Sequence, residues 1–141
     1  MQKTQFSVVL VNKAGELAKV AQVLGRARVN IEALALTDGI HTGIVKLVVD
    51  DAKRARAALK RARLPFSEQR VLAVSLEDEP GALAKLCARL AKRGLSIDYV
   101  YGSSGPGCDC DECECEGDCG CTHGVLMLSV AEIKAAQAAL K

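Results

Sequence analysis

Two stretches of the chain share one pattern: VVLVNKAGELAK at residues 8–19 and VSLEDEPGALAK at residues 74–85. Each begins with an apolar run typical of a β-strand, passes through a polar segment ending in glycine, and continues at helical spacing. The same offset of 66 residues relates Leu24 to Leu90 and Ile31 to Ile97. Further along the offset is 81, because Gly43 matches Gly124. The chain is therefore an internal repeat whose second copy carries an insertion of 15 residues.

Each repeat predicts the element order β-α-β-β-α-β, the ferredoxin-like arrangement of the α+β class. In the first repeat we expect strands at 6–11, 30–36 and 43–49, helices at 15–28 and 51–63, and an extended segment at 66–78. Thr37-Asp38-Gly39 favours a hairpin, and Asp50 or Asp51 a helix cap. The predicted units are 1–68 and 69–141. Lys141 matches Lys60, so the second unit lacks its own last strand in this sequence, and we expect the two units to share the extended segment 66–78 or to pack side by side.

The composition excludes several classes of protein. The chain has 141 residues, of which 50% are hydrophobic, and contains only two Phe, two Tyr and no Trp. Base-stacking nucleic-acid platforms need more aromatic residues, so nucleic-acid binding is not expected. The apolar runs are far shorter than the ~20 residues of a membrane helix, and the N-terminus shows no secretory signal. We expect a cytoplasmic protein with no membrane partner. The basic residues of helix 51–63 are read as its solvent face, with an acidic partner as the alternative.

The repeated motif resembles the ACT domain, a small-molecule-sensing regulatory module. Asn12-Lys13-Ala14-Gly15 with Val29-Asn30-Ile31 forms one copy of its pattern, and Asp78-Glu79-Pro80-Gly81 with Leu95-Ser96-Ile97 forms the other. The resemblance covers the chain apart from about residues 103–122, and is greatest to stand-alone tandem ACT proteins, which carry no catalytic domain. Ala14 in place of the usual Pro, and Ser96 in place of the usual Asn, are departures from the pattern.

The resemblance implies that an amino acid or a similar small ligand binds at the interface between ACT units. Because the second unit lacks its own last strand, we expect a homodimer formed through that open edge or through the helical faces. The candidate ligand-binding residues are Asn12, Gly15, Asn30, Asp78, Gly81 and Ser96. Exposed N–H groups at the helix start after each glycine suit a carboxylate, and the side-chain oxygens of Asn12 and Asp78 suit an ammonium group. The alternative is that Asn12 and Asp78 only cap the helices that follow them.

The inserted segment differs from the rest of the chain in composition and charge. Residues 108–121 hold six acidic residues and no basic one, whereas the whole chain has a net charge of +2. Closely spaced cysteine thiols in a polar, glycine-rich segment favour the binding of a soft or borderline metal ion. Zinc is the first candidate, and Cu(I) or another soft metal is the alternative. Four thiolates make one tetrahedral site, and six can share two metals. The candidate metal ligands are Cys108, Cys110, Cys113, Cys115, Cys119, Cys121 and His123.

Two other interpretations of the cysteines stay open: disulfide or redox chemistry, which needs an oxidising compartment, and an inert insertion. Catalysis has little support, because the chain has only two histidines and no nucleophile–base motif or phosphate-binding loop. The sequence therefore predicts a non-catalytic regulatory protein that binds an amino acid or similar ligand and carries a thiolate metal site. The alternative is a metal-storage or metal-delivery protein that uses the ACT-like units only as a scaffold.

Overall fold

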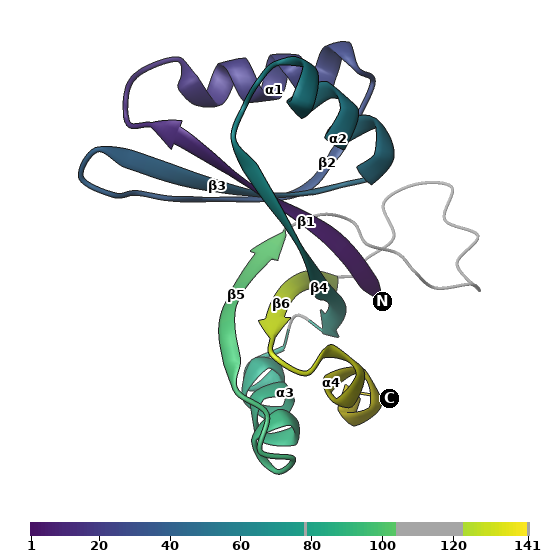
Figure 1. Cartoon of the computed structure of the whole chain (residues 1–141). Helices are drawn as coiled ribbons and strands as arrows, with labels where there is room; N and C mark the ends of the chain where they lie inside the picture. Colours follow the sequence, from purple (N-terminus) through teal and green to yellow (C-terminus); the bar gives the residue numbers. More distant parts are fainter. Residues whose placement is uncertain (78, 104–122, 141) are drawn as a thin grey trace. The chain divides into compact units, whose positions relative to one another are not determined.

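The computed structural model describes residues 1–77, 79–103 and 123–140. Figure 1 shows the arrangement of its helices and strands. In chain order, the elements are β1 (Gln2–Val11), α1 (Glu16–Arg26), β2 (Ile31–Thr37), β3 (Thr42–Val49), α2 (Ala52–Arg61), β4 (Phe66–Glu77), α3 (Ala82–Ala91), β5 (Ile97–Ser103), β6 (His123–Val130) and α4 (Ile133–Leu140).

These elements form two compact units. The first unit is Lys3–Arg70, and the second is Met1–Gln2 with Val71–Lys141. The strand order is β2-β3-β1-β4 through the first unit and β1-β4-β6-β5 through the second. Both orders are those of a ferredoxin-like sheet with antiparallel neighbours. The α+β prediction of tandem ferredoxin-like units is confirmed.

In the first unit, α1 and α2 lie on one face of the sheet (Figure 1). The β1–β3 register pairs Phe6 with Leu47 and Val8 with Val45, so alternate side chains face the helices. The apolar stripe of α1 meets them through Val20 and Leu24. The buried core consists of Phe6, Val8, Leu10, Val20, Leu24, Val29, Val45, Leu47, Val49, Ala55 and Leu59.

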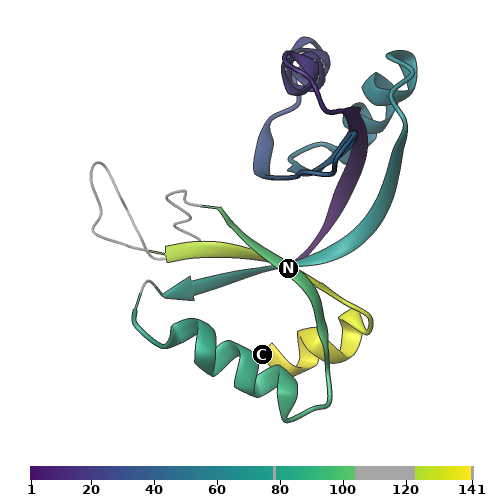
Figure 2. The same ribbon diagram turned by 90° about the vertical axis from the view of Figure 1, so that its left-hand side faces the viewer.

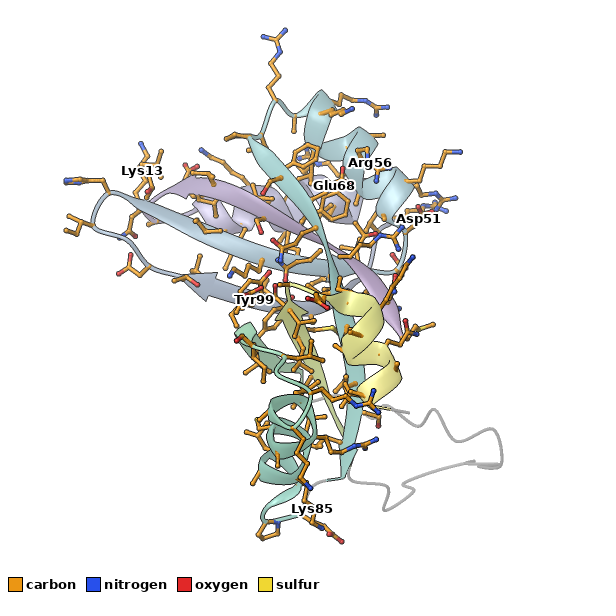
Figure 3. The ribbon with its side chains drawn as sticks, turned by 60° about the horizontal axis from the view of Figure 1, so that its bottom comes forward. Lys13, Asp51, Arg56, Glu68, Lys85 and Tyr99 are labelled. Atoms are coloured by element: carbon orange, nitrogen blue, oxygen red, sulfur yellow. The ribbon has the colours of Figure 1, made fainter. Side chains whose placement is uncertain are left out.

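Polar contacts fix α2 at its N-terminus and near its middle. Its N-cap is Asp51, whose side chain accepts a hydrogen bond from the Arg54 N–H at 2.9 Å, as the sequence predicted for one of the two aspartates. On the same helix, Arg56 donates two hydrogen bonds of 2.6 Å to the Glu68 carboxylate, and Figure 3 shows this pair together. These hydrogen bonds lower the pKa of Glu68. The pair therefore stabilises the fold above the ordinary pKa of a glutamate, and this contribution is lost as the pH falls through the lowered value.

The second unit repeats this layout. Figure 2 shows α3 and α4 lying together along one side of its strands. Its buried core consists of Leu72, Leu86, Leu90, Leu128, Val130, Ala136 and Ala139. The start of the chain supplies the edge strand that the second repeat lacks: the Ala73 N–H donates to the Met1 carbonyl, and the Met1 ammonium donates to the Ala73 carbonyl, both at 2.8 Å. Gln2 adds a side-chain bond to Gln137 at 3.1 Å. No local pattern in the sequence predicts this pairing, because it joins residues 72 positions apart.

The backbone itself repeats at the offset seen in the sequence. Gly15 and Gly81 have φ angles of 89° and 91°, and each is the residue from which a helix starts. The register shift in β2 between Ile31 and Ala33 recurs in β5 between Ile97 and Tyr99. Two positions 66 residues apart therefore share local geometry even where their side chains differ.

Element boundaries differ from the sequence prediction by a few residues. Helix α1 ends at Arg26 rather than 28, because Arg28 adopts a positive φ of 55°. Helix α2 ends at Arg61 rather than 63, since Arg63 has a φ of 54°. Strand β1 begins at Gln2 rather than Phe6, because its polar first residues continue the strand that lies between β3 and β4 in the sheet. Within the described residues, no helix is long and apolar enough to cross a lipid bilayer.

Glycine at residues 15 and 81 is required by backbone conformation rather than by space. A Cβ atom at either position would meet nothing within 4 Å. Gly15→Ala and Gly81→Ala should each cost about 1–2 kcal/mol of unfolding free energy, because the left-handed region penalises a side chain. Gly25, inside α1 and equally unobstructed, is the matched control: Gly25→Ala should gain about 0.5–1 kcal/mol.

Urea unfolding followed by circular dichroism measures all three variants. Equal effects of the substitutions at residues 15 and 25 would contradict a conformational requirement at the helix start.

Candidate functional site

A hollow of about 320 Å³ lies in the first unit where β1 passes into α1. Its floor is apolar and its rim is polar, which is the usual composition of a small-molecule site. Figure 3 shows Lys13 at this end of the unit. The residues that line the hollow are Leu10, Val11, Asn12, Lys13, Glu16, Leu17, Leu36, Asp38 and Gly43.

The loop beside the hollow is shaped by its backbone. The Lys13 N–H donates to the Val11 carbonyl at 2.9 Å, and the Glu16 N–H donates to the Lys13 carbonyl at 3.4 Å. Gly15 then takes its left-handed conformation and becomes the N-cap of α1, with no side chain bonded to the cap. The first turn of α1 therefore begins directly at the hollow, where helix N–H groups favour negative charge.

Asn12 ties this loop to the connection between β2 and β3. Its Nδ2 donates to Asp38 Oδ1 at 2.8 Å and to the Gly39 carbonyl at 3.4 Å, and its backbone N–H donates to the His41 carbonyl at 3.1 Å. The alternative that Asn12 caps α1 is wrong, because Gly15 holds that position. Asn12 instead holds one wall of the hollow against the other.

The rim of the hollow carries charges of both signs. Lys13 is exposed, and no described residue forms an ion pair with its ammonium group. Glu16 is only 16% exposed and holds Lys19 at 2.6 Å. Asp38 uses one oxygen for Asn12, so the other is left for a ligand. A cation and two carboxylates thus lie around an apolar floor of Leu10 and Leu17, and the half-exposed Leu36 lines the open side.

The candidate ligand residues fall at the two ends of the helices. Asn12 and Gly15 lie at the start of α1, whereas Asn30 follows its end. The Asn30 N–H donates to Asp50 Oδ1 at 2.9 Å, and its carbonyl accepts from the Asp50 N–H at 3.1 Å. Within the first unit, Asn30 is therefore not part of the hollow that Asn12 lines.

The second unit follows the same plan. Gly81 starts α3, whereas Ser96 is exposed and lies beyond the other end of that helix. Asp78 lies outside the described residues. The alternative that Asp78 caps α3 is not tested by side-chain geometry, although Gly81 occupies the cap position there.

The predicted metal ligands, apart from His123, lie outside the described residues. Cys108, Cys110, Cys113, Cys115, Cys119 and Cys121 lie outside the described residues, and His123 is described only as the first residue of β6. In the part of the chain that the structure describes, no three His, Cys, Asp or Glu residues gather closely enough to hold a metal ion. The metal prediction therefore rests on the sequence alone.

Asn12 is the one lining residue of the hollow that the sequence predicted, and the three charged lining residues, Lys13, Glu16 and Asp38, are additions from the structure. The sequence pattern predicts that Lys13 lies in a turn and Asp38 in a hairpin, but no local pattern indicates that these two loops lie side by side. That meeting depends on the β1–β3 and β2–β3 registers, which bring Val11 opposite Thr42 and Thr37 opposite Ile44.

Comparison with known proteins defines the family. Residues 1–105 match the model of the ACT domain pair, so the chain belongs to the ACT domain pair family. No protein in the curated set matches its sequence.

Solved structures resemble this chain over nearly its whole length. Protein BT0572 from Bacteroides thetaiotaomicron is 26% identical, with a TM-score of 0.84, and the match covers 99% of this chain and 87% of that one. The ligand-free regulatory subunit of aspartate kinase from Thermus thermophilus is 18% identical, with a TM-score of 0.66 and coverages of 99% and 88%. The regulatory subunit of aspartate kinase from Thermus flavus is 18% identical, with a TM-score of 0.64, and the match covers 99% of this chain and 89% of that one. The two subunits share the fold with this chain.

Asn12→Ala should loosen the loop beside the hollow. Losing the bonds to Asp38 and Gly39 should cost about 0.5–1.5 kcal/mol and speed hydrogen exchange at residues 37–41. Asn30→Ala is the matched control, because the bonds of residue 30 to Asp50 use its backbone and survive the change. Faster exchange of residues 37–41 in both variants would contradict a specific role of the Asn12 amide.

Proposed function

We propose that this chain is a non-catalytic regulatory protein that binds an amino acid, or a similar small zwitterion, in the hollow beside residues 12–16. The observation that carries the proposal is the rim charge of both signs around an apolar floor. A ligand carboxylate can meet the Lys13 ammonium and the first N–H groups of α1. A ligand ammonium group can meet Asp38 and Glu16, while its side chain contacts Leu17 and Leu36.

The fold of the regulatory subunits of aspartate kinase supports a regulatory role, since this chain shares that fold over 99% of its length. The family match supports ligand sensing for the same reason. Shared fold alone does not specify the ligand, which the charges and volume of the hollow must select.

The proposal includes a homodimer. Strand β2 is the outermost strand of the first unit, and Leu36, which lines the hollow, is 53% exposed there. Leu34 on the same strand is 41% exposed. An outermost strand with two exposed leucines is a surface that a second chain can cover. Such a contact would also close the open side of the hollow.

Isothermal titration of the full chain with a panel of amino acids tests the ligand proposal. One or more should bind, and Lys13→Ala should weaken that binding about tenfold, because a hydrogen bond to a charged group contributes on the order of 1.5–3 kcal/mol. Gly43→Val should block binding by filling the hollow without removing a polar group, since a Cβ at residue 43 already lies 3.5 Å from the Leu36 side chain.

Gly124→Val is the matched control, because Gly124 is the counterpart of Gly43 in the second repeat and a Cβ there meets nothing within 4 Å. It should leave the affinity unchanged. No heat with any member of the panel, or equal loss in both valine variants, would contradict the proposed site.

We further propose that the cysteine-rich segment binds a thiophilic metal ion, zinc first. Ser103 of β5 is the register partner of Val125 of β6, so the chain leaves one strand and re-enters its neighbour at adjacent points. The segment between them is thus a hairpin connection. A metal bound by several thiolates supplies a cross-link that so polar a sequence cannot obtain from a core.

Elemental mass spectrometry of the protein purified under reducing conditions tests the metal proposal. The full chain should carry at least one equivalent of zinc or another soft metal, and a variant lacking residues 106–122 should carry none. If the deletion abolishes metal uptake and no amino acid binds the full chain, the metal-storage alternative is favoured. A metal-free full chain that takes up neither Zn(II) nor Cu(I) would overturn the metal proposal.

A further inference from the structure

A second hollow lies in the second unit, along the outer edge of β4 beneath α3 and the end of α4. Its volume is about 250 Å³, and it is formed within a single unit. Figure 3 shows Lys85 on α3. The lining residues are Val74, Ser75, Leu76, Ala82, Lys85, Leu86, Arg89 and Leu140. This hollow is distinct from the one beside residues 12–16, and the proposed ligand site does not use it.

The first repeat shows what fills the equivalent place. There the chain leaving α2 runs along β1: the Val9 N–H donates to the Pro65 carbonyl at 3.1 Å, and the Phe66 ring lies 5.7 Å from that of Phe6. Leu64 also packs against the core of the first unit. In the first repeat an extended apolar segment therefore covers the edge that the hollow exposes in the second.

In the second repeat, Ser75 is the counterpart of Val9. The strand that pairs with β4 there ends at Met1, which bonds Ala73 in both directions. Alternate residues of a strand turn their N–H and C=O groups to the same edge, so those of Ser75 face the same side as those of Ala73. No described residue forms a hydrogen bond with the Ser75 backbone at this edge. N–H and C=O groups without partners at a sheet edge are a template for an added strand.

The charge at this edge differs between the repeats. In the first, Glu16 holds Lys19 at 2.6 Å. The matching residues of the second repeat are Ala82 and Lys85, so the lysine there has lost its acidic neighbour. Arg89, where the first repeat has an apolar residue, adds another cation, and no described residue forms an ion pair with Lys85 or Arg89. The second hollow thus combines apolar lining residues with two positive charges that no described residue pairs with.

We propose that the β4 edge at Ser75 and this hollow bind an extended segment of a partner protein by strand addition. The Ser75 backbone supplies main-chain hydrogen bonds, and a leucine or phenylalanine of the partner enters the hollow, as Leu64 and Phe66 pack in the first repeat. Acidic residues flanking that side chain meet Lys85 and Arg89. The first repeat defines the shape of the occupant, and the two cations define its charge.

A fluorescein-labelled peptide with the sequence of residues 63–69, but with glutamate in place of Arg63, tests the proposal by fluorescence anisotropy with the full chain. It should bind, and the double substitution Lys85→Glu with Arg89→Glu should weaken binding at least about fivefold, because two charges that attract the acidic residues of the peptide then repel them. Lys92→Glu is the control, because Lys92 is exposed and does not line the hollow. It should leave the affinity unchanged.

Ser75→Pro removes the outward N–H and should abolish binding, whereas Ser75→Ala should retain it. Peptide binding should also slow hydrogen exchange of the Ser75 amide in the unaltered chain, which tests the strand addition without a substitution. Equal binding by the double charge variant and Lys92→Glu, or unchanged exchange at Ser75, would overturn the proposal. The proposal would also be overturned if the chain self-associates and the double substitution disrupts that self-association, because the occupant of the hollow would then be a second copy of the chain.

Discussion

The left-handed glycine between strand and helix is the constraint on which both units depend. Gly15 and Gly81 each carry a φ near 90°, and a helix starts at once after each. Such a turn brings the first helical N–H groups beside the end of the strand with no intervening side-chain cap. In the first unit, this leaves the space that Lys13, Glu16 and Asp38 surround. The geometry of the candidate site is thus a consequence of how the chain enters its first helix.

The two repeats share a backbone but differ in what covers their strand edges. In the first, the segment Leu64–Phe66 closes the edge of β1 and completes the apolar core. In the second repeat, the corresponding segment is Met1–Gln2, and its backbone hydrogen bonds to β4 are those between Met1 and Ala73. The duplicated fold thereby gains two unlike hollows: the described residues of one carry charges of both signs, and those of the other carry positive charges. Duplication followed by local change can give one small chain two separate binding surfaces.

Much of the fold could be predicted from the sequence, because repeat, periodicity and glycine position all depend on neighbours along the chain. The cap at Asp51 and the order of elements follow from such local signals. The candidate site could be predicted only in part. Asn12 was singled out, but its bond to Asp38 spans 26 residues and depends on strand register. The edge strand supplied by Met1 was missed for the same reason, since it joins residues 72 positions apart.

The central claim, that a small zwitterion binds beside residues 12–16, is tested most directly by two-dimensional amide NMR of the labelled chain during titration with an amino acid. The account predicts that shifts concentrate at Lys13, Gly15, Glu16, Asp38 and Gly43, around the hollow and the start of α1. Shifts confined to other parts of the chain, with these five amides unmoved at saturation, would contradict it.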